Sequence, residues 1–297
     1  MSEEHVKTHD ERPGLVVVGT DASDDAQRAV VFGLRSAMRR DADLLLVNAV
    51  DDALMAGSWG VVYDPEVLQR AGQAACETAR QFAIDNGFPE HRIRTDVLLG
   101  SPGAVLTRLS EVADLIVVGR RATSGLERMF VGSTSVSVVG AASCPVVVVS
   151  AASNPEPTGQ HGVVGVGLNA NPSSTSTIEA GFDQARLRGT RLELIHAVQL
   201  PMGLFAPKST PEQIDQHVEF SRGGIEAMIA PLREKYPDVE TTVRVVADTP
   251  LNELLSRSEH LDLLVLGVPH SNWPGFSLGG LIRGMLAHAR CPLYLTK

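Results

Sequence analysis

The segment Val16-Val-Val-Gly-Thr-Asp-Ala22 recurs as Val164-Gly-Val-Gly-Leu-Asn-Ala170, at an offset of 148 residues (16 to 164). Three more blocks keep this offset and a fifth keeps an offset of 147 residues (144 to 291); in the first copy they are residues 44–50, 97–102, 113–119 and 144–149. A spacing held through five blocks indicates an internal duplication. We therefore expect a polar tail at residues 1–14, one domain at residues 15–150, a linker at residues 151–161 and a second domain at residues 162–297.

Each copy alternates short apolar runs with stretches of helical periodicity. In the first copy the apolar runs are residues 15–18, 44–50, 95–99, 115–118 and 146–149, which have the length and composition of strands. Continuous apolarity fits parallel strands that are covered on both faces. Asp64-Pro65 predicts a helix start and Gly87 predicts that helix's end. The pattern predicts an α/β fold with a doubly wound parallel sheet in each of two tandem domains, and ligands beyond the carboxyl ends of the strands.

The composition argues against several classes of protein. The chain has 297 residues and a formal net charge of −9, whereas non-specific nucleic-acid binding needs a basic face. No apolar run approaches the roughly 18–20 residues of a membrane span, and the polar N-terminal residues do not resemble a signal peptide. The three cysteines lack metal-ligand spacing. We expect a cytoplasmic protein that binds neither nucleic acid nor membrane.

Two short loops follow predicted strands of the first copy. In Gly19-Thr20-Asp21, the glycine lets a ligand approach the backbone, and the carboxylate can accept hydrogen bonds from an amino or hydroxyl group. The alternative is that Asp21 or Ser23 only caps the next helix. Ser101-Pro102 fits a helix cap better than a ligand site.

The longest loop runs from Gly119 through Arg120-Arg121-Ala122-Thr123-Ser124-Gly125 to Gly132-Ser133-Thr134. Glycines, hydroxyls and a helix N-terminus together offer backbone N–H groups to an anion, and arginines add bidentate phosphate contacts. The loop matches neither the Walker A pattern nor the dinucleotide-binding glycine pattern. The alternative is an ordinary surface loop with solvated arginines.

These features resemble the universal stress protein family in its tandem-domain form, over nearly the whole chain. The family signature Gly-x₂-Gly-x₉-Gly-Ser/Thr is matched from Gly119 to Ser133, except that Ala122 replaces the second glycine. The resemblance implies a Rossmann-like fold of the adenine nucleotide alpha-hydrolase type. It also implies that ATP is bound in the first copy, with Asp21 facing the adenine and the backbone of Ala49, after the second strand, reading the adenine edge.

The resemblance implies a full set of ATP contacts in the first copy. These are Gly19, Thr20, Asp21, Ala49, Gly119, Arg120, Arg121, Ala122, Thr123, Ser124, Gly125, Gly132, Ser133 and Thr134. It also implies that the last strands of the two copies, which follow Cys144-Pro145 and Cys291-Pro292, pair with each other. The two cysteines are then structural, and a homodimer of the whole chain is compatible with the family.

The second copy departs further from the signature. Its equivalent positions are Gly167, Asn169, Ala197, Gly267, His270, Gly279 and Gly280. Asn replaces Asp21, Val268-Pro269 replaces the two arginines, and Leu281 replaces the hydroxyl of Thr134. We interpret this second site as degenerate or altered.

The first hypothesis for function is an ATP-binding stress and growth regulator that holds ATP, with or without Mg²⁺, and signals to a protein partner that the sequence does not identify. The second is an enzyme that hydrolyses ATP slowly. Residues 119–133 contain Glu127 as their only acid and neither Lys nor His, which does not favour evolved turnover. The third is a nucleotide-free scaffold whose two loops are relics.

Overall fold

The computed structural model of the chain describes residues 13–51, 65–120, 132–153, 161–168, 174–199, 210–268 and 278–297. The elements of the first copy are β1 (Leu15–Gly19), α1 (Asp24–Arg40), β2 (Asp43–Val50), α2 (Pro65–Asp85), the 3-10 helix η2 (Glu90–Arg92), β3 (Ile93–Leu99), α3 (Pro102–Leu109), β4 (Leu115–Gly119), α4 (Ser133–Ala141) and β5 (Val146–Val149). Those of the second copy are β6 (Val163–Gly167), α5 (Thr175–Arg188), β7 (Arg191–Ala197), α6 (Pro211–Lys235), β8 (Thr241–Val246), α7 (Pro250–Ser258), β9 (Leu263–Gly267), α8 (Gly280–His288) and β10 (Leu293–Thr296).

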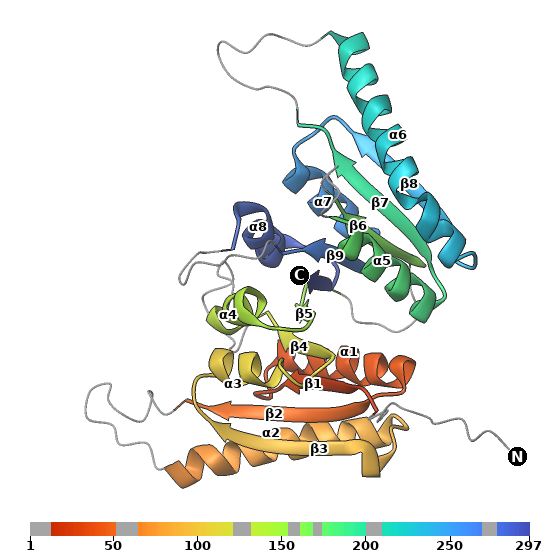
Figure 1. Cartoon of the computed structure of the whole chain (residues 1–297). Coiled ribbons are helices and arrows are strands. Elements are labelled where there is room, and N and C mark those ends of the chain that lie inside the picture. The colour runs from red at the N-terminus through yellow and green to blue at the C-terminus, as the bar shows by residue number, and fades with distance from the viewer. Residues whose placement is uncertain are drawn as a thin grey trace, which may run out of the picture.

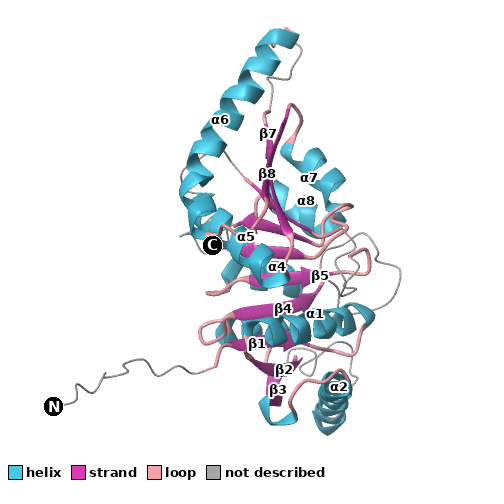
Figure 2. Cartoon of the chain, turned by 90° about the vertical axis from the view of Figure 1, so that its right-hand side faces the viewer, coloured by secondary structure: helices cyan, strands magenta, loops and turns pink. Residues whose placement is uncertain are grey.

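The strands of both copies join into one sheet with the order β3-β2-β1-β4-β5-β10-β9-β6-β7-β8. Within each copy, neighbouring strands run parallel, so the predicted doubly wound α/β fold is confirmed. The copies are joined where β5 and β10 pair antiparallel, which confirms the predicted pairing of the last strands. Figure 1 shows the copies stacked with this joint between them, and Figure 2 shows the strands of the first copy in succession from β3 through β2, β1 and β4 to β5.

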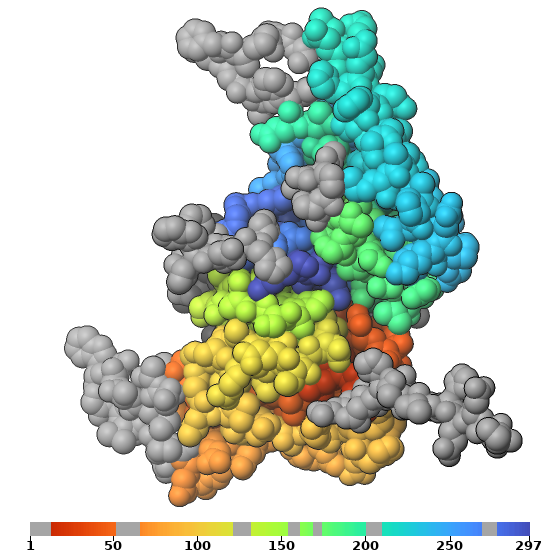
Figure 3. Space-filling view, viewed as in Figure 1, coloured from red at the N-terminus to blue at the C-terminus, as the bar shows by residue number. Residues whose placement is uncertain are grey.

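The register of the central ladder locates the symmetry of the molecule. Tyr294 lies opposite Val147, and these two residues occupy the same position of the repeat (147 to 294). A pseudo-twofold axis therefore passes between them. The green-yellow surface of the first copy and the blue surface of the second meet along this line in Figure 3.

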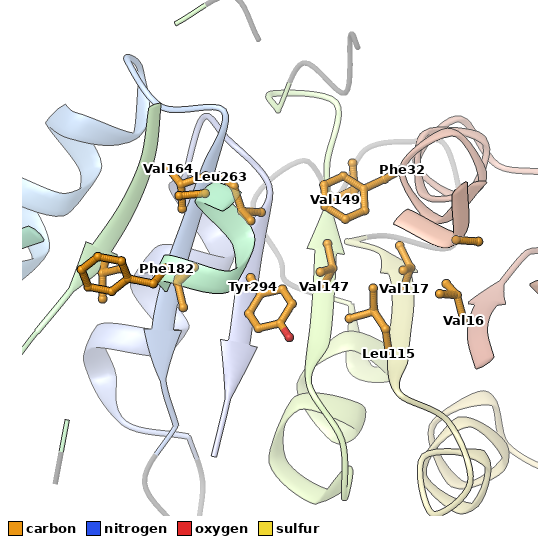
Figure 4. Close-up of a cluster of buried hydrophobic side chains, with 14 of the residues drawn as sticks. Val16, Phe32, Leu115, Val117, Val147, Val149, Val164, Phe182, Leu263 and Tyr294 are labelled. Carbon is orange, nitrogen blue, oxygen red and sulfur yellow. The ribbon is translucent and has the colours of Figure 1, made fainter. Parts of the chain in front are cut away.

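Two layers of apolar side chains cover the sheet, and both continue from one copy into the other. The layer on one face contains Val16 and Val18 of β1 and side chains of α1, α2, α5 and α6; the layer on the other face contains Val17 and side chains of α3, α4, α7 and α8. Alternate residues of a strand point to opposite faces, so the uniformly apolar runs supply both layers. Figure 4 shows the first layer crossing from Val16 through Val147 and Tyr294 to Phe182.

Local signals fix the ends of several helices. The predicted start at Pro65 and stop at Gly87 are confirmed: α2 begins at Pro65, and Gly87 adopts φ +84° beyond its end. Thr249 caps α7 through the N–H of Asn252, whereas Ser101 precedes α3 without a side-chain cap within the described part of the chain. Asp64 lies outside the described residues.

Candidate functional site

The crevice beyond β1 and β4 is where the fold offers a ligand site in the first copy. These neighbouring parallel strands end at Gly19 and Gly119, and the chain then leaves toward opposite faces of the sheet, through α1 and α4. Loops that diverge in this way leave a crevice at the carboxyl end of a doubly wound sheet. The second copy repeats the arrangement between β6 and β9.

The loop after β1 is built by its own side chains. One carboxylate oxygen of Asp21 accepts the N–H of Ser23 at 3.0 Å, and the Ser23 hydroxyl caps α1 by accepting the N–H of Ala26 at 3.2 Å. The capping alternative therefore holds for Ser23. Asp21 makes a local turn and remains exposed. Ala22 closes the turn with φ +62°, a left-handed conformation that costs a non-glycine residue about 1 kcal/mol.

Two hydrogen bonds with β2 hold Thr20, a residue that is 5% exposed, in the loop after β1. The Thr20 N–H donates to the carbonyl of Val47 at 2.9 Å, and the Asn48 amide donates to the carbonyl of Thr20 at 2.8 Å. The equivalent pair in the second copy is His196 Nδ1 and the carbonyl of Leu168, 3.0 Å apart. Sequence reasoning missed Asn48. The signal was its alignment with His196 at the repeat offset, since both side chains can donate to a carbonyl.

Ala49 lies inside β2, opposite Leu98 of β3, and not after the strand as expected. Backbone polar groups of a strand alternate between its two sides. Because Val47 accepts a hydrogen bond from Thr20, the N–H and C=O of Ala49 point to the same side, beyond the point where β1 ends. The expected backbone role of Ala49 is therefore geometrically available from within the strand.

The glycines that end the strands have packing roles that the sequence did not reveal. A Cβ on Gly119 would lie 2.7 Å from the backbone carbon of Asp25 in the first turn of α1, and one on Gly19 would lie 3.1 Å from Leu106. In the second copy, a Cβ on Gly267 would meet the Thr177 hydroxyl at 2.6 Å. These glycines allow helices to pack closely on the strand ends, a role beside the ligand approach that the sequence predicted.

The N-terminus of α4 opens onto the crevice. Gly132 is its N-cap, and within the described residues no side chain caps this helix end. The first N–H groups of a helix have no partner in the helix, and together they carry a partial positive charge. Ser133 is exposed and Thr134 is partly exposed beside them. The N–H of Gly132 donates to the carbonyl of Arg120 at 3.0 Å, which brings the two ends of the loop together.

Arg120 points away from the crevice, contrary to its expected phosphate contact. Its side chain is 8% exposed, and Nη1 donates to the carbonyl of Ala287, in the last turn of α8 in the other copy, at 2.7 Å. Lys297 makes the reciprocal contact: its ammonium group donates to Ala142 and, at 3.5 Å, to Gly140 at the end of α4. Gly140 and Ala287 are equivalent positions (140 to 287), so each copy supplies a cation to the negative end of the other's helix.

The remaining predicted residues divide into two groups. In the second copy, Gly167 and Gly267 end neighbouring strands, Ala197 ends β7, and a Cβ on Gly279 or Gly280 would meet nothing within 4 Å. Arg121, Ala122, Thr123, Ser124, Gly125, Asn169 and His270 lie outside the described residues.

The cysteines fit the structural role expected of Cys144 and Cys291. Burial raises the pKa of Cys76 and of Cys144 to about 11, and it also raises the pKa of Cys291. Among the described residues no three His, Cys, Asp or Glu side chains gather as a metal site. Nor does any described helix combine the length and the apolar character needed to cross a membrane.

Comparisons with known proteins agree with this architecture. The model of the Universal stress protein family matches residues 15–150 and 162–297. A universal stress protein of Mycobacterium tuberculosis is 27% identical over 290 residues, covering 95% of this chain and 96% of its own length. One from Mycolicibacterium smegmatis is 28% identical over 288 residues, with 95% and 96% covered. The crystal structure of a universal stress protein from Archaeoglobus fulgidus has the same fold, with a TM-score of 0.67 at 16% identity over 95% of this chain and 96% of that chain. The chain belongs to the universal stress protein family.

Proposed function

We propose that the crevice beyond β1 and β4 binds an adenine nucleotide, ATP, and that the protein is a nucleotide-dependent regulator of stress and growth rather than a turnover enzyme. The observation that carries this proposal is the N-terminus of α4, which lies at the point where β1 and β4 diverge and has a glycine cap without a side-chain partner in the described residues. A phosphate group supplies the acceptors that such a helix end needs.

The residues present fit a nucleotide. The backbone amides of Ser133 and Thr134, with their hydroxyls, would hold phosphate oxygens. The exposed carboxylate of Asp21 and the backbone groups of Ala49 are suited to the donors and acceptors of an adenine edge. ATP supplies charge and a hydrolysable phosphate when bound. This chain supplies the residues that surround the phosphates and the adenine. Binding would change the contacts made by the two ends of the loop from Gly119 to Gly132.

Residue chemistry favours binding over turnover. Hydrolysis at a useful rate needs a base or a metal-held water aligned with the terminal phosphate. The loop from Gly119 to Ser133 offers Glu127 and otherwise only neutral and arginine side chains as polar groups. Slow hydrolysis is compatible with this site, and Mg²⁺ would then arrive with the nucleotide. A cytoplasmic location and a protein partner that responds to the bound state belong to the same proposal.

A matched pair of variants tests the proposal. Gly132 and Gly279 are equivalent N-caps (132 to 279), with φ of −60° and −55° that any residue can adopt. We expect wild-type protein, purified without added nucleotide and then denatured, to release about one adenine nucleotide per chain. Gly132→Glu should abolish this release because its carboxylate repels phosphate at α4. Gly279→Glu should leave the release unchanged if the second copy is degenerate.

Three other outcomes would contradict parts of the proposal. No nucleotide in the wild type, together with no heat on titration with ATP, would favour the scaffold alternative. About two nucleotides per chain, with half lost in each variant, would mean that both copies bind. Steady release of phosphate from ATP in the presence of Mg²⁺, removed by Gly132→Glu, would identify an enzyme.

A further inference from the structure

The joint between the copies brings together two equivalent helices. α1 and α5 cover the same face of the sheet and contact each other across the pseudo-twofold axis. They end at Arg40 and Arg188, which are the same position of the repeat (40 to 188). Figure 4 shows Phe32 of α1 and Tyr294 of β10 together on this face, next to Val147 and Val149.

Arg188 is held at this joint beside an aromatic ring rather than in an ion pair with a described residue. Its guanidinium carbon lies 5.0 Å from the centre of the Phe32 ring, so the group contacts an aromatic side chain of the other copy. Its Nε is enclosed and has no hydrogen-bond partner among the residues that the structure describes. An enclosed N–H group without an acceptor is costly, and stacking on an aromatic ring does not replace the acceptor.

Other cations surround Arg188. Burial, and after it the charges of Arg39 and Arg40, lower the pKa of Arg188 to about 9. Burial, and then the charge of Arg35, lower the pKa of Arg39. Burial raises the pKa of Tyr294, while the charge of Arg40 and a hydrogen bond from it act in the opposite direction. Arg39 and Arg40 therefore lie near Arg188, and the Tyr294 hydroxyl experiences the positive charge of Arg40 together with the negative charge of Asp183.

Each of the two nearby carboxylates also has other partners. Asp262 favours the charged form of Arg188, but its two oxygens accept the N–H groups of His161 and Val163 at 3.2 Å each. Asp183 accepts the Tyr236 hydroxyl at 2.8 Å and pairs with Arg186 at 3.3 Å. Among the ion pairs between described residues, none joins Arg39, Arg40 or Arg188 to either carboxylate. In a chain of net charge −9, this cluster of like charges is a local exception.

We propose that the joint between α1 and α5 binds a phosphate oxyanion, free or as the end of a phosphate ester, through Arg39, Arg40 and Arg188 with the Tyr294 hydroxyl as a further donor. Guanidinium groups match phosphate oxygens in bidentate geometry, and an anion with more than one negative charge relieves repulsion between several of them. Each of the three arginines keeps part of its surface exposed, although the Nε of Arg188 is enclosed.

This site is separate from the proposed nucleotide crevice. α1 starts at Asp24, shortly after β1, and packs back along the strand, so Arg40 lies at the edge of the sheet where the strands begin. The nucleotide crevice lies at the edge where they end. Either proposal can therefore fail without the other.

The test is a calorimetric titration of the full-length chain with inorganic phosphate and with glycerol phosphate, with chloride keeping the ionic strength constant. Gly132→Glu serves as the background, so that the helix end at α4 does not contribute. We expect phosphate binding that Arg188→Met and Arg40→Met each weaken by about tenfold or more. The matched control is Arg186→Met, which removes the same charge from the same helix turn. Because the Arg186 guanidinium stacks on Tyr236 at 4.6 Å, this control should change affinity by less than about twofold.

Several results would overturn the proposal: phosphate affinity unchanged in Arg188→Met, an equal loss in Arg186→Met, or acetate binding as tightly as phosphate. Binding of glycerol phosphate as well as phosphate would identify a phosphate ester as the accepted ligand, and binding of phosphate alone would identify the free anion. Arg188→Lys keeps the positive charge but loses the planar guanidinium that can donate two parallel hydrogen bonds. We therefore expect its phosphate affinity to lie between those of the wild type and Arg188→Met. Circular dichroism of each variant checks its fold.

Discussion

The two crevices share a frame and differ in the groups that line it. In both copies a side chain from the second strand holds the loop after the first strand: Asn48 binds Thr20, and His196 binds Leu168. In both, a glycine caps an otherwise uncapped helix. The first copy then offers Ser133 and Thr134 at that helix, where the second offers Gly280 and Leu281. The comparison distinguishes residues that shape the crevice in both copies from residues that supply polar groups for a ligand in the first copy alone.

The largest difference in stability between the copies should come from the glycines that end β4 and β9. A methyl group on Gly119 meets the backbone of α1 at Asp25, whereas one on Gly267 meets the Thr177 side chain, which can rotate. We expect Gly119→Ala to lower the free energy of unfolding by about 3 kcal/mol and Gly267→Ala by about 1 kcal/mol. Urea unfolding followed by circular dichroism measures both. Equal losses would show that the backbone of α1 yields as easily as a side chain.

The second difference concerns the cations that cross the joint. Arg120 is buried and donates a charge-assisted hydrogen bond to α8, whereas Lys297 is partly exposed at the end of α4. Arg120→Met should cost about 2 kcal/mol of unfolding free energy, and Lys297→Met less than about 1 kcal/mol. Because Arg120 does not face the crevice, nucleotide release from Arg120→Met should match the wild type. Loss of bound nucleotide in that variant would indicate that Arg120 contacts the phosphate, as the sequence suggested.

A third comparison concerns the side chains of Asn48 and His196 that bind the loop after the first strand of each copy. It tests whether they affect ligand affinity as well as stability. Asn48→Ala and His196→Ala each remove the side-chain partner of a loop carbonyl, so each should cost about 1 kcal/mol. Only Asn48→Ala should also lower the affinity for ATP, since only the first crevice is proposed to bind it. Asn48→His keeps a donor at this position and should retain the affinity. Calorimetric titration distinguishes these variants, and equal affinity in all three would remove Asn48 from the site.

The smallest effect concerns the equivalent cysteines. Burial raises the pKa of Cys144 to about 11 and also raises that of Cys291, so at about pH 8 both are thiols and neither is an effective nucleophile. The thiolate fraction grows as the pH rises toward the pKa, so alkylation of partly exposed Cys144 should accelerate with pH. Cys291 is 4% exposed and should react only when the protein unfolds. Mass spectrometry after timed iodoacetamide treatment gives both rates, and faster labelling of Cys291 would contradict its enclosure.

The sequence predicted most of the frame. The repeat offset and the apolar runs led to the strands, to the doubly wound sheet and to the pairing of β5 with β10. Local signals such as the proline at 65 and the glycine at 87 act over a few residues, so they can be interpreted without knowing the fold.

Features that depend on the meeting of distant segments were harder to predict. Arg120 next to Gly119 suggested a phosphate contact, but its direction depends on where α8 of the other copy lies. The packing of Gly119 against Asp25 likewise depends on the path of α1 over β4. Ala49 lies inside β2, which ends at Val50 as the apolar run 44–50 predicted, so the position after the strand that the resemblance implied for Ala49 is the part that differs.

The antiparallel joint of β5 and β10 also governs how the protein can diversify. In an assembly of two identical chains, every substitution appears on both sides of the axis, so an arginine that suits one side is imposed on the other. Here the halves are tethered, association is intramolecular at high effective concentration, and each half mutates alone. Arg120 in one half with Val268 at the equivalent position of the other, and Val147 in one half with Tyr294 in the other, are combinations that a symmetric pair cannot reach. Fusion of the two halves therefore allows their functions to diverge: one half can keep a ligand-binding site while the other acquires a different function.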